Sequence, residues 1–234
     1  MQYQFPIFER LCPSWGGITH LGTRRRFAKG TVILALEGAV DGVYYVKEGV
    51  VETILDTHIG PEKVLYRVGQ GCVFGEVSCF APGPDQEAFV RARADCTLYH
   101  FKRELVEGVI AQEHPELLLE LIRMLGHIVR MYGVLLQDSL SLGFFARVCR
   151  FLVYLARFKE ARPDGTQVHV VVESGVTQSE MAGMLGIHRV TVAKAIRKLK
   201  EQGVIRRFTK RELEITDFQR LLKLSEGGPA EDGR

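Results

Sequence analysis

A dense group of cations near the C-terminal end of the sequence is the feature with the clearest chemistry. The segment 188–211 holds nine lysine and arginine residues against one acid, Glu201, which gives a local charge of +8. Double-stranded DNA carries about one negative charge per 1.7 Å of its axis, and a cationic surface gains affinity by releasing bound counterions. A solvated surface would have the same composition, so the elements that carry the cations decide the interpretation.

The residues around this group predict two short helices joined by a tight turn. Thr177 followed by Glu180 has the spacing of a capping box, which begins a helix. Gly186 stands where the chain would turn, and apolar side chains recur at spacings that let the two helices cross, at Met181, Leu185, Ile187, Val192 and Ala195. The pattern is typical of a helix-turn-helix, whose second helix enters the major groove of DNA.

The second helix sorts into an apolar face and a polar face. Arg189, near its start, can reach guanine, and Val190 can contact a thymine methyl group. Thr191 and Lys198 are placed for phosphate, which positions a protein without reading sequence. The following segment predicts a hairpin with a basic tip, a wing against the DNA backbone. The predicted DNA-binding residues are Thr177, Gln178, His188, Arg189, Val190, Thr191, Lys194, Arg197, Lys198, Arg206, Arg207 and Lys210.

A long amphipathic segment precedes the helix-turn-helix. Residues 115–140 predict one helix, with Pro115 tolerated in its first turn. Its main apolar row can pair with a second copy of the helix, which gives a predicted dimer interface of Leu118, Leu121, Leu125, Ile128, Tyr132 and Leu135. Ile122, Val129 and Leu136 form a second row, so one row can cover the preceding domain and the other a partner. Packing on that domain alone is the alternative; we expect a homodimer.

The first part of the chain predicts a small antiparallel β-barrel. From about residue 25 to 101, short segments rich in Val, Tyr, Phe and Thr are separated by glycines. The expected fold class is therefore α+β: an antiparallel jelly-roll barrel, a long dimerisation helix and a winged helix-turn-helix. The expected boundaries are residues 1–114 for the barrel, 115–140 for the helix and hinge, 141–224 for the DNA-binding domain and 225–234 for a disordered tail.

Charge and motifs restrict the classes of function. The 234 residues carry a net charge of only +3, but residues 1–138 carry −3 and residues 139–234 carry +6. No apolar run has the length of a membrane span and no signal peptide is recognisable, so we expect a cytoplasmic protein without a membrane partner. No phosphate loop, zinc-protease helix or serine nucleophile elbow is present, which predicts no catalytic residues and no enzyme. Five scattered cysteines without a Cys-x-x-Cys pair predict no metal site.

The order of these parts resembles the family of bacterial transcription regulators typified by the cyclic-AMP receptor protein and the fumarate–nitrate reduction regulator. The resemblance rests on VYYVKEGVVE, VGQGCVFGE and TQSEMAGMLGIHRVTVAKAIRKLKEQGVI, and it extends from about residue 27 to 224. It implies that the barrel binds an effector and that the long helices transmit the resulting conformational change to the DNA-binding domain. It also implies that a dimer binds a palindromic promoter site and contacts RNA polymerase.

The effector region departs from the members of this family that bind cyclic AMP. Those members place an arginine and a serine where this chain has Gln86 and Glu87, and Glu87 would repel a cyclic phosphate. Tyr132 would fill space that a small hydroxyl residue leaves for the base. We therefore expect a small organic effector, as in the halophenol-sensing branch, and not cyclic AMP. The predicted effector pocket is Gly75, Glu76, Val77, Phe80, Gln86, Glu87, Phe89, Arg91, His127 and Tyr132.

Other sensors remain open. The iron–sulfur branch has three close cysteines near the N-terminus, where this chain has only Cys12, so such a cluster is not expected. The haem branch uses a histidine where this chain has Cys79, which leaves haem as a weaker option. Alternatively the barrel is vestigial, and DNA binding is constitutive or tuned by oxidation of Cys12, Cys79 or Cys96.

Because Val190 replaces the glutamate of the cyclic-AMP receptor's recognition helix, a different DNA site is expected.

Overall fold

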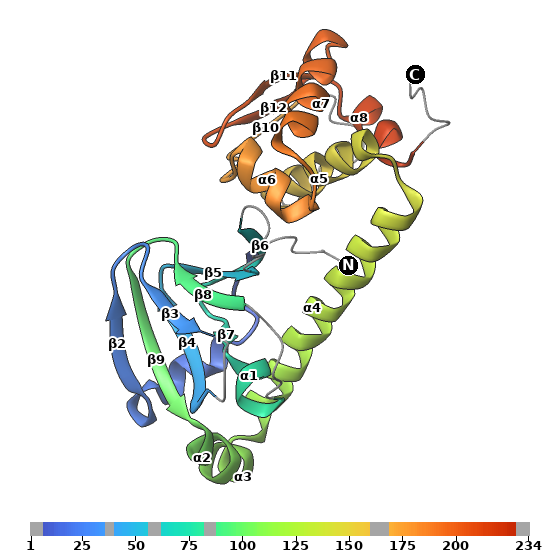
Figure 1. The fold of residues 1–234 in the computed structure, drawn as a ribbon. Helices are drawn as coiled ribbons and strands as arrows, with labels where there is room; N and C mark the ends of the chain where they lie inside the picture. The colour runs from blue at the N-terminus through green and yellow to red at the C-terminus, as the bar shows by residue number, and fades with distance from the viewer. Residues whose placement is uncertain (1–6, 36–39, 56–61, 82–87, 160–168, 228–234) are drawn as a thin grey trace. The chain divides into compact units, whose positions relative to one another are not determined.

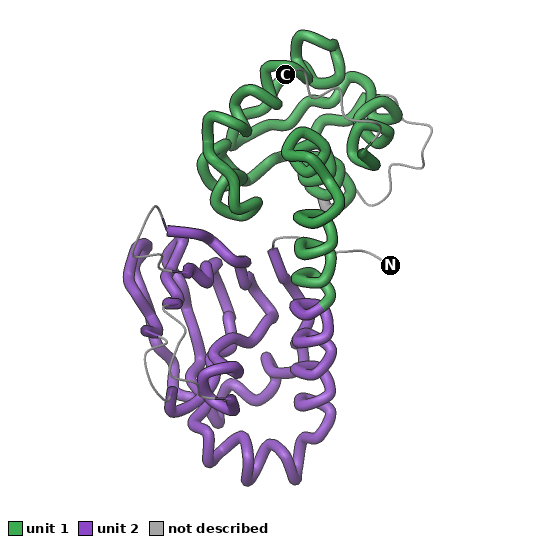
Figure 2. The backbone as a smooth tube through the Cα atoms, turned by 45° about the vertical axis from the view of Figure 1, so that its right-hand side comes forward, with its two compact units in different colours: residues 1–5, 130–234 green, residues 6–129 purple. Residues whose placement is uncertain are grey.

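The chain divides into two compact units. The computed structural model describes residues 7–35, 40–55, 62–81, 88–159 and 169–227. Unit 2 comprises residues 6–129, and unit 1 comprises residues 1–5 and 130–234 (Figure 2). The boundary therefore falls inside the long helix, whereas the sequence suggested a separate segment between two domains.

Unit 2 is built on two β-sheets (Figure 1). One sheet has the strand order β1-β6-β5-β8-β3 and the other β2-β9-β4-β7; among the described strands, β1 and β6 are parallel and the remaining pairs are antiparallel. The strands are β1 (Ile7–Phe8), β2 (Thr23–Phe27), β3 (Val32–Ala35), β4 (Gly42–Glu48), β5 (Val50–Leu55), β6 (Lys63–Gly69), β7 (Val73–Phe74), β8 (Ala88–Ala92) and β9 (Cys96–Lys102). The glycine-punctuated strands of the sequence thus form the expected antiparallel domain.

Gly49 illustrates why glycine separates these strands. It joins β4 to β5 with a φ of +91°, a conformation that other residues rarely adopt. A Cβ at this position would lie 2.5 Å from the carbonyl oxygen of Asp95. The tight hairpin and its close neighbour both require a residue without a side chain.

Short helical elements and an aromatic contact fasten the sheets to the long helix within unit 2. These elements are η1 (Pro13–Leu21), α1 (Glu76–Phe80), α2 (Arg103–Leu105), η2 (Val106–Ile110) and α3 (Ala111–Glu113). Trp15 is fully buried, packs edge-on against Phe101 at a ring separation of 5.3 Å, and donates its indole N–H to the carbonyl of Leu117 at 3.2 Å. The indole therefore satisfies its polar group while it fills the core.

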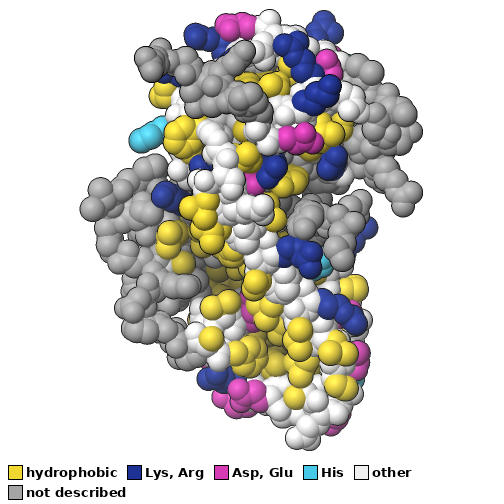
Figure 3. Space-filling model, turned by 90° about the vertical axis from the view of Figure 1, so that its right-hand side faces the viewer, with side chains coloured by type: hydrophobic (Ala, Val, Ile, Leu, Met, Phe, Trp, Pro, Cys, Tyr) yellow, Lys and Arg dark blue, Asp and Glu magenta, His cyan; other side chains and the backbone are white. Residues whose placement is uncertain are grey.

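The long helix α4 (Pro115–Ser141) has two apolar faces of different character. Its buried row in unit 2 consists of Leu117, Leu121, Met124 and Ile128. A second row is between 51% and 79% exposed and consists of Leu119, Ile122, Val129, Leu136 and Leu140. Figure 3 shows hydrophobic side chains gathered on this side of the molecule.

The two rows correct the predicted dimer interface. Leu121 and Ile128 belong to the buried row, so they face their own chain. Leu118, Leu125 and Leu135 are half-buried and flank the rows. None of the predicted interface residues belongs to the exposed row, because three- and four-residue spacing also fits a line that drifts around the helix.

Unit 1 contains the C-terminal part of α4 and a small α+β domain. Its elements are α5 (Phe144–Lys159), β10 (Val170–Val172), α6 (Gln178–Leu185), α7 (Arg189–Glu201), β11 (Ile205–Phe208), β12 (Leu213–Ile215) and α8 (Phe218–Ser225), with the sheet order β10-β12-β11. Arg150 of α5 pairs with the buried Asp138 of α4 and donates to the carbonyl of Ser225 at 3.2 Å. Ser225, placed in the tail from the sequence, is thus the buried end of α8, and residues 228–234 lie outside the described residues.

None of the helices in the described parts of the chain combines the length and apolar character that crossing a bilayer requires.

Candidate DNA-binding surface and effector pocket

The predicted helix-turn-helix is present in unit 1 as α6, a turn and α7. The capping box is complete: the backbone N–H of Thr177 donates to Glu180 Oε2 at 2.7 Å, and the backbone N–H of Glu180 donates to Thr177 Oγ1 at 3.2 Å. Gly186 ends α6 in the left-handed conformation, with a φ of +63°. Arg147 of α5 donates to the carbonyl of Leu185 at the same helix end, so both termini of α6 have hydrogen-bonding partners.

Helix α7 presents the two faces that the sequence predicted. Val192, Ile196 and Leu199 are buried, whereas Val190 is 64% exposed beside the exposed Arg189. Further along the exposed side lie His188, Lys194 and Arg197, and Thr191 is half-buried. Arg197 pairs with Glu201 one turn later at 3.5 Å, a contact that exposed side chains make at little free-energy gain.

The wing is the hairpin of β11 and β12. Arg206 lies 3.5 Å from Glu214 and Arg207 lies 3.2 Å from Glu212, so both predicted wing cations are partly neutralised by acidic residues of the same hairpin. Lys210 at the tip is exposed, and Gly175 donates its backbone N–H to the carbonyl of Lys210 at 2.9 Å. That bond holds the wing tip against the loop that leads into α6.

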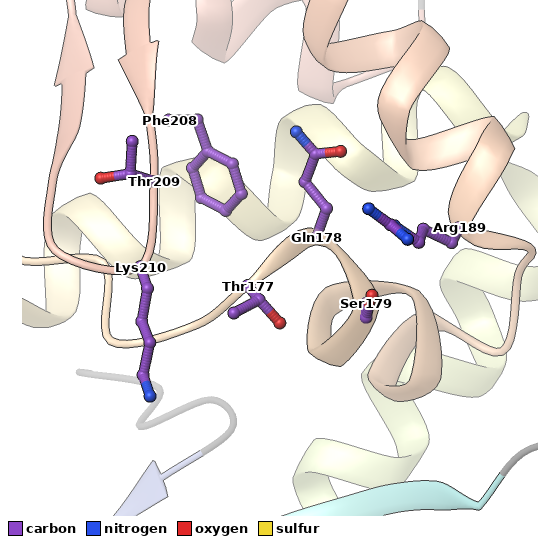
Figure 4. Close-up of a pocket in the computed structure, with 7 residues that line it drawn as sticks. All are labelled: Thr177, Gln178, Ser179, Arg189, Phe208, Thr209 and Lys210. Carbon is purple, nitrogen blue, oxygen red and sulfur yellow. The ribbon is translucent and has the colours of Figure 1, made fainter.

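A cleft of about 250 Å³ lies where the wing tip, the start of α6 and the start of α7 meet. Its lining residues are Thr177, Gln178, Ser179, Arg189, Phe208, Thr209 and Lys210. In Figure 4 the side chains of Gln178 and Arg189 point toward the same space. The positive end of the helix dipole at a helix start and nearby cations together favour an anion such as a DNA phosphate.

The cations of this cleft are available for a ligand. They are Arg189 and Lys210, and neither forms an ion pair with a residue that the structure describes. The same holds for Lys194, which is exposed on α7 outside the cleft lining. The sequence reasoning named four of the seven lining residues and missed Ser179, Phe208 and Thr209. Thr209 could have been noticed: its Oγ1 accepts the backbone N–H of Glu212 at 3.1 Å, a side-chain turn that Thr three residues before Glu permits.

Lys198 differs from its prediction as a phosphate contact. It is half-buried, and its ammonium group lies 4.7 Å from the centroid of the Phe145 ring on α5. The aromatic face attracts the cation. Lys198 therefore joins α7 to α5 instead of projecting with Lys194.

Glu76 is the most perturbed residue of the predicted effector pocket. It follows Gly75, whose φ is +92° and whose Cβ, if present, would meet Leu34 at 3.2 Å. Glu76 is 4% exposed, and its Oε2 makes no hydrogen bond with any residue that the structure describes. Burial raises the pKa of this carboxyl group to about 7, without a nearby charge contributing. Unit 2 therefore holds an internal acceptor without a described partner.

The remaining predicted pocket residues that the structure describes are all more exposed than Glu76. Val77 and Phe80 are 44% and 38% exposed, and the guanidinium of Arg103 lies 5.8 Å from the Phe80 ring. His127 is exposed on α4. Gln86 and Glu87 lie outside the described residues. Tyr132 belongs to unit 1, so its place in a pocket stays a prediction.

Arg91 is engaged in a row of cross-strand ion pairs. Arg67, Glu52 and Arg91 stand directly opposite one another on β6, β5 and β8 and so share one face of the sheet. Arg91 Nη2 lies 3.0 Å from Glu52 Oε1, and Arg91 Nη1 lies 2.9 Å from Glu62. The guanidinium also lies 5.6 Å from the Phe89 ring, so two predicted pocket residues contact each other. The sequence spacing could not show these acidic partners.

All five cysteines are buried free thiols. Burial raises the pKa of Cys12, Cys79 and Cys96, which reduces the thiolate that reacts with oxidants. The cysteine-switch alternative therefore lacks the exposed, low-pKa thiol that such switches use.

Comparison with known proteins identifies the parts of the chain. Residues 24–113 match the cyclic nucleotide-binding domain family and residues 146–224 match the Crp-like helix-turn-helix domain family. The cAMP-activated global transcriptional regulator CRP of Haemophilus influenzae is 30% identical over 190 residues, which cover 80% of this chain and 81% of that protein. The chain belongs to the CRP/FNR family of transcription regulators.

Solved structures show the same CRP/FNR fold. A CooA variant from Carboxydothermus hydrogenoformans has a TM-score of 0.78 at 20% identity and covers 93% of this chain and 100% of its own. A cysteine-to-serine variant of CprK complexed with OCPA has a TM-score of 0.76 at 18% identity and covers 91% of this chain and 94% of its own. The predicted fold class is thus confirmed, and this CRP/FNR member is a DNA-binding regulator with an effector-binding domain.

Proposed function

We propose that this CRP/FNR regulator binds a palindromic promoter site as a homodimer, contacts RNA polymerase, and responds to a small organic effector by a change in DNA binding and without catalysis. The observation that carries the DNA-binding part is the cleft of unit 1. It brings Arg189 and Lys210 to the start of α6, and neither cation is paired with a described residue. A free cationic cleft beside an exposed recognition helix is the arrangement that phosphate and base contacts need.

The DNA-binding proposal is tested with Lys210→Ala. Lys223→Ala is the matched control, because Lys223 is an exposed cation of the same unit on α8 and outside the cleft. Binding of the full chain to DNA from upstream of its own gene is measured at several salt concentrations. We expect Lys210→Ala to lower the salt slope by about one unit and Lys223→Ala to leave it unchanged. Equal slopes for both variants and the parent protein would contradict the assignment.

The homodimer proposal rests on the exposed row of α4. Leu119, Ile122, Val129, Leu136 and Leu140 follow a heptad pattern whose two remaining positions are Gly126 and Gly133. A Cβ at either glycine would have no described atom of this chain within 4 Å, although glycine costs a helix about 1 kcal/mol relative to alanine. A second copy of α4 that crosses closely at the glycines accounts for both the exposed row and the missing side chains.

The dimer is tested by placing charge on this row. We expect Val129→Glu with Leu136→Glu to give a monomer in sedimentation and to weaken binding to a palindromic site by roughly two orders of magnitude, because the second half-site is no longer linked. His127→Glu is the control, because His127 is exposed on α4 but lies off the row. A charged double variant that stays dimeric would refute the proposed interface.

The effector proposal rests on residues of the barrel. Glu76 supplies a buried acceptor, while Gln86 and Glu87 take the sequence positions at which cyclic-AMP-binding members have an arginine and a serine for the cyclic phosphate. Titration of the full chain with cyclic AMP and with o-chlorophenolacetic acid, the ligand named for one CprK structure, compares the two chemistries. We expect no heat of binding with cyclic AMP. Saturable cyclic-AMP binding would contradict this part and leave the DNA-binding proposal intact.

A further inference from the structure

Three sulfur-bearing side chains lie buried in the interior of unit 2, outside the surfaces that the regulator function uses. Cys12 precedes η1, Cys72 lies between β6 and β7, and Met124 is on the buried row of α4. None of the three residues is more than 1% exposed. The Sγ atom of Cys12 lies 3.7 Å from the Sδ atom of Met124. Three segments that are far apart in the sequence thus contribute one soft donor each.

Backbone hydrogen bonds hold the two cysteine segments together. The N–H of Cys12 donates to the carbonyl of Gly71 at 2.7 Å, and the N–H of Leu11 donates to Cys72 Sγ at 3.4 Å. The N–H of Val73 in turn donates a hydrogen bond to the Cys12 thiol. Each of the two cysteine sulfurs therefore faces an amide of the other segment, an arrangement that also stabilises a thiolate.

We propose that Cys12, Cys72 and Met124 form a binding site for one soft monovalent metal ion of the Cu(I) type. Thiolate and thioether donors select this class of ion. A metal–sulfur bond of about 2.3 Å places two donors of a trigonal site about 4 Å apart, close to the observed 3.7 Å. Each thiol that binds the ion releases its proton to solvent, and no electron is transferred. Among the described residues, no three His, Cys, Asp or Glu side chains form a group that could hold a metal ion. The proposed site has two cysteines, and its third donor is the thioether of a methionine.

Occupation of the site would fasten the N-terminal element to the long helix. η1 already contacts α4 through Ser14, whose hydroxyl donates to Glu120 at 2.8 Å, and through Trp15. A bound ion would add a link between η1, the β6–β7 turn and α4, whose opposite row is the exposed one. Because the unfolded chain lacks the assembled site, binding would raise the melting temperature of the full chain.

The test titrates reduced full-length protein with Cu(I) under nitrogen, in competition with the chromogenic chelator bathocuproine disulfonate. The protein should withdraw one equivalent of Cu(I) per chain, and Cys12→Ala and Cys72→Ala should each abolish this. Met124→Leu, which conserves volume, should keep the fold and weaken binding by roughly tenfold or more. Cys149→Ala is the control, because Cys149 is an equally buried thiol of unit 1. Incubation before each reading allows exchange through local opening.

Several outcomes would overturn the site. The site is refuted if the parent protein withdraws no Cu(I), or if Cys12→Ala still withdraws a full equivalent. It is also refuted if Cys149→Ala loses as much Cu(I) binding as Cys12→Ala, or if Met124→Leu keeps the parent's Cu(I) affinity and a native circular dichroism spectrum. Loss of two thiols on addition of hydrogen peroxide, without Cu(I) binding, would identify a redox pair instead. The titration contains no DNA, so its failure would leave the proposed DNA-binding function untouched.

Discussion

The proposed DNA-binding surface of unit 1 and the charged residues of unit 2 use their charges in opposite ways. In unit 1, Arg189, Lys194 and Lys210 are exposed and form no ion pair with described residues. In unit 2, Arg91 is already held by Glu52 and Glu62, and Glu76 is buried. An exposed, unpaired cation can bind a ligand at little free-energy cost. A paired charge must first break its ion pairs, and a buried carboxyl group must first change its protonation state.

This difference shows when a charged residue in a sequence indicates a binding site. A cation indicates a ligand-binding site only if no residue of its own chain pairs with it. On α7 the helical period of the sequence predicts which cations are exposed. Cross-strand partners such as Glu52 and Arg91 are 39 positions apart, so no local pattern relates them. Single substitutions distinguish a charge that stabilises the fold from a charge that binds a ligand.

The largest expected effect is at Glu76. Since its folded-state pKa is raised from 4.5 to about 7, the folded chain binds more protons than the unfolded chain between these values. The free energy of unfolding should therefore fall as the pH rises through this window and stay level above it. Glu76→Gln should remove this dependence and be more stable at pH 8 by up to about 3 kcal/mol. Urea denaturation from pH 5 to pH 8 measures it.

The control for Glu76 is Glu113→Gln, since Glu113 is exposed. It should leave the pH profile unchanged. A Glu76→Gln variant that is less stable than the parent at pH 8 would mean that the carboxylate has a native partner, and the contrast with unit 1 would weaken.

Arg91 should show the next largest effect. Arg91→Ala leaves Glu52, which is 6% exposed, with Arg67 at 3.7 Å as its remaining cationic partner among the described residues. We expect a loss of about 2 kcal/mol in the free energy of unfolding, less than for a fully buried pair because Arg91 is partly exposed. Arg24→Ala, at an exposed arginine of β2, should cost much less. If Arg91→Ala keeps full stability but loses the effector response, Arg91 belongs to a binding site after all.

The same contrast explains how much the sequence could predict. The capping box of Thr177 and Glu180 and the turn at Gly186 appear where they were expected, because these signals act over a few residues. The glycine-punctuated strands also formed the predicted sheets. Local hydrogen-bonding signals and periodicity in the sequence were therefore sufficient to predict the fold and the helix-turn-helix.

The parts that could not be predicted depend on tertiary contacts. Leu121 and Ile128 differ from Val129 and Leu136 only in which side of α4 the rest of the chain covers. The sulfur cluster of Cys12, Cys72 and Met124 joins positions up to 112 residues apart. Neither arrangement has a sequence period, since each is produced by packing of distant elements.

Arg189 and Lys194 separate base recognition from phosphate binding within unit 1. Arg189→Ala should weaken binding to the cognate site by about 1.4 kcal/mol, or tenfold, and relax the preference at one base position. Lys194→Ala should weaken all DNA sequences alike and lower the salt slope by about one unit. Binding selections from randomised DNA, repeated at two salt concentrations, distinguish the two. Identical changes on cognate and random DNA would show that Arg189 contacts only phosphate.

Lys198 should give the smallest effect, and it tests the comparison inside the DNA-binding domain itself. Its ammonium group contacts the ring of Phe145, so it resembles the engaged charges of unit 2 more than its neighbour Lys194. Lys198→Ala should leave DNA affinity and the salt slope unchanged while it lowers the free energy of unfolding by about 0.5–1 kcal/mol. Phe145→Leu should remove the same stabilisation, and combining the two variants should add little. A lower salt slope in Lys198→Ala would instead show that a cation contacting an aromatic ring still reaches DNA, so that engagement by the fold does not exclude use by a ligand.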